Sequence, residues 1–263
     1  MKTNFGLIAV TITLLSASLA GCMGDEDSSE EYSGPIDLIV YYDSTSGMIE
    51  TSENNGQTGP TTGVELSFDF ADTTSDDGSI TKIMIEPDDG SSPVEGDPAD
   101  NAVISYTWMT HGVFTVTLTA EDSDGNSHSI MVKVKIDMHI VWSDTNTATA
   151  SMTFDATPDC EDGDPLPDRI TISSTVENPG QIFGGNSDVA WSLNNPSEEE
   201  IASNSGTLGN GASETWDYTS RDIVEGFWSL DVEVTNGDNV NVNNDVTIAY
   251  AEGAEDATNP RTE

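Results

Sequence analysis

Apolar and polar residues alternate with a period of two along most of this 263-residue chain, and the alternation limits the folds that it can adopt. Successive side chains of a β-strand point to opposite faces of its sheet, so such a run predicts a strand with one buried face. The clearest runs are Val64–Phe70, Phe114–Ala120, Ile130–Ile136, Ala148–Phe154 and Trp228–Val234. No convincing stretch has the period of a helix, and clusters of Asp, Gly and Ser separate the runs as turns. The sequence therefore predicts an all-β fold.

The predicted strands fall into two sets. The first set ends at Ile136, and the second begins near Met138. Many short strands with turns between them predict two immunoglobulin-like β-sandwich domains in tandem, at residues 35–137 and 138–251. Residues 252–263 have no apolar period and are predicted to form a disordered tail.

The first 21 residues have the composition of a secretory signal peptide. Lys2 precedes an apolar run from Phe5 to Ala20, and small residues follow it. A transmembrane helix is the alternative, but a bilayer core requires about 20 mostly apolar residues, and this run is shorter and contains hydroxyl residues. Residues 22–34 are acidic and contain Ser and Gly, which predicts a flexible tether.

The signal peptide ends in Leu19-Ala20-Gly21-Cys22, which resembles the lipobox of prokaryotic lipoproteins. The resemblance implies that the sulfur of Cys22 receives a diacylglyceryl group and that Cys22 becomes the first mature residue. Two acyl chains anchor a protein stably, so the membrane is a predicted partner and the location is the extracytoplasmic membrane surface. Ordinary secretion without a lipid is the alternative.

The chain is strongly acidic, with 7 Lys and Arg residues against 48 Asp and Glu residues and a formal charge of −41. This charge excludes nucleic acid as a partner, because nucleic-acid binding depends on cationic contacts to phosphates. It indicates either cation binding and steering of basic partners or a solvated surface suited to high salt. We favour the solvated surface.

Few residues have the spacing of an active site. His111, His128 and His139 are not placed like zinc ligands and are predicted at turns or strand ends on the surface. Cys160 lies among carboxylates that disfavour its thiolate, so it is a poor nucleophile. The sequence predicts a protein that is not an enzyme and requires no cofactor.

One acidic loop is a candidate calcium site. Calcium takes six to eight oxygen ligands, and alternating carboxylates around Gly163 could supply several. The candidate ligands are Asp159, Glu161, Asp162, Asp164 and Asp168. A solvated acidic loop is the alternative. The second acidic stretch, Glu121–Asn126, is predicted to be a hairpin turn.

Five tryptophans could line a sugar-binding surface. Trp191 and Trp228 alternate with polar neighbours and are predicted to lie in the core, whereas Trp216 is predicted to be exposed.

Two stretches of the first half resemble a known family. Ser75–Ile80 is similar to the Asp-Gly turn of PKD domains. Tyr106–Gly125 is similar to the Gly-aromatic, Val-Thr-Leu-Thr and Asp-x-x-Gly pattern of the same family. Residues 64–136 thus resemble a PKD domain, an immunoglobulin-like module common in prokaryotic surface proteins. The family's Trp-Asp-Phe-Gly-Asp-Gly signature is Ile85–Gly90 here, and Tyr106 replaces its histidine, so no binding surface centred on that tryptophan is transferred.

The second half resembles CARDB-like adhesion modules in its turns at Asn178–Gly180 and Leu208–Gly211. Together the two resemblances imply a cell-surface lipoprotein that acts as an adhesion, protein-binding or spacer module, with an envelope protein or a polysaccharide as partner. A solute-binding lipoprotein of a transporter and a hydrolase with an unrecognised site are the alternatives.

Overall fold

Alternating residues of the sequence are alternately buried in the computed structural model, which describes residues 32–160 and 165–262. In β9 (Gly112–Asp122), the side chains of Phe114, Val116 and Leu118 are fully buried, whereas Thr115 between them is exposed. The described residues form strands and no helix, which confirms the predicted all-β fold.

Strands β1 to β9 build the first half. They are β1 (Ile36–Asp37), β2 (Ser46–Asn54), β3 (Gln57–Thr58), β4 (Val64–Asp69), β5 (Thr74–Ser75), β6 (Ile80–Glu86), β7 (Val94–Gly96), β8 (Val103–Trp108) and β9. The core of this half lies between β4 and β8 on one side and β6, β9 and the following strand on the other, with Phe68, Trp108, Ile85 and Phe114 among its members.

Strands β11 to β17 build the second half, after a strand that both halves share. They are β11 (Thr149–Asp155), β12 (Arg169–Glu177), β13 (Ser187–Asn194), β14 (Glu200–Leu208), β15 (Ser213–Ser220), β16 (Phe227–Asn236) and β17 (Val240–Ala249). A four-stranded sheet in the order β11-β16-β13-β14 packs on β15, β12 and β17. Ile170 and Val246 of one layer meet Trp228 and Leu230 of the other, which makes a β-sandwich.

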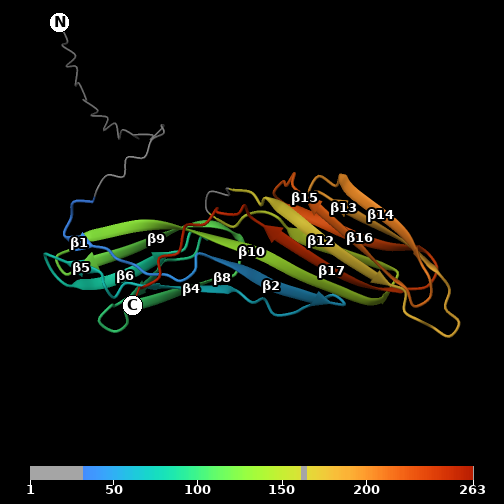
Figure 1. Ribbon diagram of the computed structural model, residues 1–263, viewed down its shortest axis with the longest axis horizontal. Coiled ribbons are helices and arrows are strands. Elements are labelled where there is room, and N and C mark those ends of the chain that lie inside the picture. Colours follow the sequence, from blue (N-terminus) through green and yellow to red (C-terminus); the bar gives the residue numbers. More distant parts are fainter. Residues whose placement is uncertain (1–31, 161–164, 263) are drawn as a thin grey trace, which may run out of the picture. The chain divides into compact units, whose positions relative to one another are not determined.

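The shared strand is β10 (Ser127–Thr147), which is 21 residues long. Its first part pairs antiparallel with β9, and its second part pairs antiparallel with β17 and parallel with β2 (Figure 1). Since β2 and β17 pair with the same stretch, Met138–Ser143, they occupy opposite edges of β10. The junction predicted at residues 137 and 138 therefore lies inside one continuous strand, and Gly34–Glu263 forms one compact unit. Independent folding of 35–137 and 138–251 stays a prediction.

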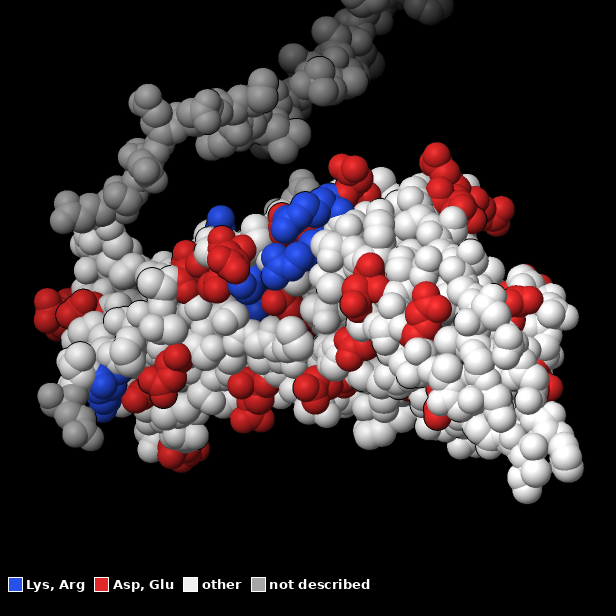
Figure 2. All heavy atoms as spheres, turned by 45° about the vertical axis from the view of Figure 1, so that its right-hand side comes forward, with Lys and Arg blue, Asp and Glu red and all other residues white. Residues whose placement is uncertain are grey.

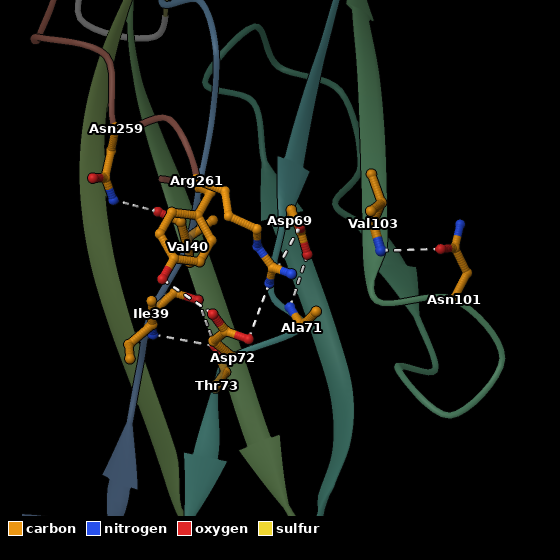
Figure 3. A network of polar contacts seen from close by, with 11 residues as sticks. Ile39, Val40, Asp69, Ala71, Asp72, Thr73, Asn101, Val103, Asn259 and Arg261 are labelled. Carbon is orange, nitrogen blue, oxygen red and sulfur yellow. Dashed lines mark hydrogen bonds and ion pairs between the residues drawn. The ribbon is translucent and has the colours of Figure 1, made fainter. Parts of the chain in front are cut away.

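The C-terminal segment differs from the prediction of a disordered tail. After β17 it returns to the first half, where Asp256 exchanges hydrogen bonds with the backbone of Lys133. Asn259 pairs with Tyr42, and its side-chain amide donates to the carbonyl of Val40 at 2.7 Å. Arg261 lies between Asp69 and Asp72 (Figure 3), with its Nη2 at 3.6 Å from Oδ2 of Asp69 and 3.0 Å from Oδ1 of Asp72. The prediction was wrong because these contacts are polar and leave no apolar pattern in the sequence.

Removal of residues 251–263 is expected to lower the free energy of unfolding by about 2–4 kcal/mol, since several hydrogen bonds of about 0.5–1.5 kcal/mol each would go. The ion pairs of Arg261 are half exposed and contribute less. The expected fall in melting temperature is about 5–10 °C by differential scanning calorimetry. Truncation after Arg261 is the control and should leave the transition in place. An unchanged unfolding transition after the longer deletion would show that the segment packs on the fold without stabilising it.

The predicted signal peptide, Cys22 and residues 22–31 of the predicted tether lie outside the described residues. In the part of the chain that is described, no helix has the length and apolar character needed to cross a membrane.

Candidate functional site

A cleft of about 430 Å³ lies where the nine-stranded sheet and the four-stranded sheet diverge. Strands β2, β3 and β10 form one side, and β11 with the loop after it forms the other. The loop between β8 and β9 closes one end. Its lining residues are Thr51, Ser52, Glu53, Thr58, Met109, Thr110, His111, Met138, Ile140, Trp142, Thr153, Phe154, Asp155, Thr157, Pro158 and Asp159.

The apolar floor of the cleft comes from β10. Met138, Ile140 and Trp142 alternate along this strand, so their side chains share one face. The parallel register pairs Ile140 with Thr51 and Trp142 with Glu53, which brings the hydroxyl and the carboxylate of β2 to the same face. The indole N–H of Trp142 donates to Oδ2 of Asp144 at 2.9 Å, which fixes the orientation of the ring.

The opposite side is held in shape by the end of β11. Oδ1 of Asp155 accepts hydrogen bonds from the backbone N–H of Thr157 at 2.9 Å and from its hydroxyl at 2.7 Å. The hydroxyl oxygen of Thr157 in turn accepts from the N–H of Gly226 at 3.0 Å. This turn places Pro158 and Asp159 in the lining of the cleft.

His111 closes the end of the cleft, and its position contradicts the predicted surface turn. Its side chain is 5% exposed. Nε2 lies 3.1 Å from the carbonyl oxygen of Asp155, so Nε2 carries the hydrogen, and Nδ1 accepts from the hydroxyl of Tyr250 at 2.8 Å. Burial lowers the pKa of His111 and raises the pKa of Tyr250 above its usual value. As neutral groups, His111 and Tyr250 thus link the loop before β9 to the end of β11 and to the residue that follows β17.

Carboxylates set the charge of the cleft. Glu53, Asp155 and Asp159 line it, and the described lining contains no Lys or Arg. Figure 2 shows Asp and Glu scattered over one face of the protein, with Lys and Arg gathered at few places. An anionic ligand would meet repulsion here, whereas a cationic or neutral one would not.

The predicted calcium ligands are not brought together as far as the structure describes them. Glu161, Asp162 and Asp164 lie outside the described residues. Asp159 lines the cleft, and the carboxylate of Asp168 accepts from Arg169 at 3.3 Å and from Arg221 at 2.9 Å. Among the described residues, no group of three His, Cys, Asp or Glu side chains could hold a metal ion. Calcium binding stays a prediction.

The acidic stretch Glu121–Asn126 is the hairpin turn between β9 and β10, as predicted, with Gly125 at a φ of 86°. Asp122 organises the turn. Its two oxygens accept from the side-chain amide of Asn126 at 2.9 Å, the hydroxyl of Ser75 at 2.7 Å, and the N–H groups of Asn126 and Asp124. These bonds, above all the one from the Asn126 side chain, lower the pKa of Asp122 to about 2.

Acid should therefore weaken the fold through Asp122. A carboxyl with a pKa below its ordinary value of 3.8 stabilises the folded state above pH 4, and this contribution is lost as the pH falls towards 2. Melting temperatures measured from pH 5 to pH 2 should drop more steeply for the wild type than for Asp122→Asn. Asp124→Asn, whose exposed carboxylate makes none of these bonds, should follow the wild type. Parallel curves for Asp122→Asn and the wild type would remove Asp122 as the cause.

The tryptophans differ in burial and in position. Trp191 and Trp228 are buried, at 1% and 0% exposed, which confirms their prediction. Trp216 was predicted to be exposed but is half-buried and stacks on Tyr218 with ring centroids 5.9 Å apart. Trp142 lines the cleft. The sequence did not distinguish Trp142 from the other tryptophans, because its position in the cleft depends on the pairing of β2 with β10.

A family model supports the resemblance stated for the first half: the PKD domain model matches residues 51–136. No curated protein sequence matches the chain. The resemblance of the second half to CARDB-like modules stays a prediction.

Several solved structures match this chain at low identity and low TM-score. Carbohydrate-binding modules from the β-sandwich superfamily match with 15% identity and a TM-score of 0.30, over 83% of this chain and 98% of that chain. Tripeptidyl peptidase 2 matches with 7% identity and a TM-score of 0.27, over 81% of this chain and 20% of that one. A β-glucuronidase of Bacteroides uniformis matches with 10% identity and a TM-score of 0.25, over 81% of this chain and 30% of that one. The chain thus spans less than a third of the length of each of these two enzymes.

Proposed function

We propose that this chain, with its PKD domain at residues 51–136, is a non-enzymatic binding module held outside the membrane by a lipid on Cys22. The cleft between β10 and β11 is its ligand site. The observation that carries the proposal is the combination of an apolar floor that includes Trp142 with carboxylates along both sides. Such a concave site with a few convergent polar groups is typical of a binding site.

The polar groups of the cleft support binding rather than catalysis. Both ring nitrogens of His111 are engaged within the chain, and burial lowers its pKa, so it is poorly placed to exchange protons with a ligand. One oxygen of Asp155 holds the turn at Thr157. These groups fix the shape of the cleft.

The ligand belongs to one of two classes, an envelope protein or a polysaccharide. A partly buried indole can stack on a sugar ring or cover an apolar side chain, and the hydroxyls of Thr51, Ser52, Thr58 and Thr153 can bond either class. The all-β architecture disfavours the solute-binding lipoprotein considered above, because that class is usually α/β.

Isothermal titration of the mature protein tests the cleft. The probes are basic, acidic and neutral pentapeptides together with neutral and acidic hexasaccharides. At least one probe should bind, and Trp142→Ala should raise its Kd at least tenfold. Phe183→Ala is the matched control, since this aromatic side chain is 99% exposed and does not line the cleft. Absence of binding by every probe, or equal binding by Trp142→Ala, would contradict the proposed site.

A further inference from the structure

Strand β11 presents an open edge to the cleft. Within the described chain it pairs with β16 and with no other strand, so it is the edge of the four-stranded sheet. It follows β10 almost directly, separated by Ala148, yet the two strands belong to different sheets. The cleft is the space between them, and Thr153, Phe154 and Asp155 of β11 line it.

The backbone groups of alternate residues in β11 point towards the two edges of the strand. The N–H of Ala156 donates to the carbonyl of Gly226, and the carbonyl of Ala148 accepts from the N–H of Val234. The backbone N–H and C=O groups of the even-numbered residues therefore point towards β16. The backbone N–H and C=O groups of Ser151 and Thr153 therefore point away from β16, in the plane of the sheet.

The two ends of this edge are already occupied within the chain. At the start, the hydroxyl of Thr147 bonds both the N–H and the carbonyl of Thr149. At the far end, the carbonyl of Asp155 accepts from His111. Between these ends, Ser151 and Thr153 offer two N–H and two C=O groups at the spacing of a β-strand, about 6.8 Å for every second residue.

Charge selects what can approach this edge. Glu53 and Asp159 lie at the cleft with Asp155, and Trp142 gives an aromatic face beside them. Carboxylates next to an indole favour Lys or Arg side chains, through ion pairs and cation–π contacts.

We infer that the cleft binds an extended peptide segment with basic side chains, which adds to the edge of β11 as a further strand. The inference rests on the proposed function and names the ligand class of the same site. In strand addition, backbone hydrogen bonds hold the peptide and alternate side chains give specificity. Here the backbone bonds come from Ser151 and Thr153, and the alternate basic side chains meet Glu53 and Asp159. A polysaccharide would use Trp142 but has no row of N–H and C=O groups to match the edge.

The test uses the mature chain and the probe Ac-Lys-Val-Lys-Val-Lys-NH₂, with binding measured by titration calorimetry. A second probe carries N-methyl groups on every residue, so that it keeps its charge but cannot donate along either edge. A third replaces Lys by Glu, and a neutral hexasaccharide is the fourth. The first probe should bind, and the N-methylated and acidic probes should bind at least tenfold more weakly.

Two protein variants separate the contributions. Thr153→Pro removes the backbone N–H that points away from β16, and proline is tolerated on an edge strand. This substitution should raise the Kd of the basic probe at least tenfold. Glu53→Gln combined with Asp159→Asn keeps the strand edge and removes two negative charges. It should weaken binding of the basic probe and reduce the salt dependence of that binding. The N-methylated probe needs no variant, so the test holds even if Thr153→Pro unfolds.

Each outcome has one meaning. Equal binding of the plain and N-methylated probes would overturn strand addition. Binding of the hexasaccharide alone, lost in Trp142→Ala, would overturn the peptide inference but leave the proposed function standing. Binding of none of the probes would count against both.

Discussion

Replacement of Cys22 by serine is expected to move the protein from the membrane fraction to the soluble fraction, or to leave it as an uncleaved precursor. The proposed thioether would need a thiol at this one position, directly after the apolar run of the predicted signal peptide. In the proposed lipoprotein, burial of two acyl chains would contribute about 0.8 kcal/mol per methylene, so their loss would remove the anchor. Fractionation of cells followed by detergent phase partitioning measures the effect.

Cys160→Ser is the matched control, because it removes the other cysteine of the chain, which is buried in the fold. This variant should stay in the membrane fraction. If Cys22→Ser also remains there and still partitions into detergent, the protein is held at the membrane by something other than a lipid on Cys22.

Trp108→Ala is expected to lower the free energy of unfolding by about 3–5 kcal/mol, the usual cost of removing a buried aromatic side chain. The indole is fully buried and donates to the carbonyl of Pro87 at 3.3 Å. It also packs edge-on against Tyr106, with centroids 4.8 Å apart, and against Phe114 at 6.1 Å. For a chain of this size the melting temperature should fall by about 10 °C or more.

Met131→Ala is the control for this loss, since Met131 is large but 71% exposed. Its effect should stay within about 0.5 kcal/mol. Similar melting temperatures for Trp108→Ala and the wild type would mean that the first half re-packs around the missing ring.

Strands with one apolar face could be predicted from the sequence, because burial on one side of a sheet leaves a mark at every second residue. Ile130–Ile136 and Trp228–Val234 lie in β10 and β16. Strands with few apolar residues left no such mark. β14 and β2 are largely polar and exposed, since β14 is the edge of its sheet and the C-terminal part of β2 borders the cleft.

The cleft could not be predicted because it depends on pairing between distant segments. Glu53 and Trp142 are 89 positions apart and become neighbours only through the parallel register of β2 and β10. His111 and Tyr250 are 139 positions apart, and their hydrogen bond gives no local pattern. Turn chemistry is local, in contrast, so the hairpin at Asp122–Gly125 was predictable.

The parallel pairing of β2 with β10 has a mechanical consequence for an anchored protein. If tension enters through the N-terminal segment and leaves through a ligand on β11, it acts first on the pairing of β1 with β5 and on the bridges of Tyr41 and Tyr42. Once these have separated, it pulls β2 at its first residue and β10 at its last. The nine residue pairs from Ser46 to Asn54 are then loaded lengthwise and must slide past one another together. A strand peeled from its end would instead release its bonds singly. The arrangement would thus resist a steady pull on a protein that is anchored at its N-terminus and holds a ligand at β11.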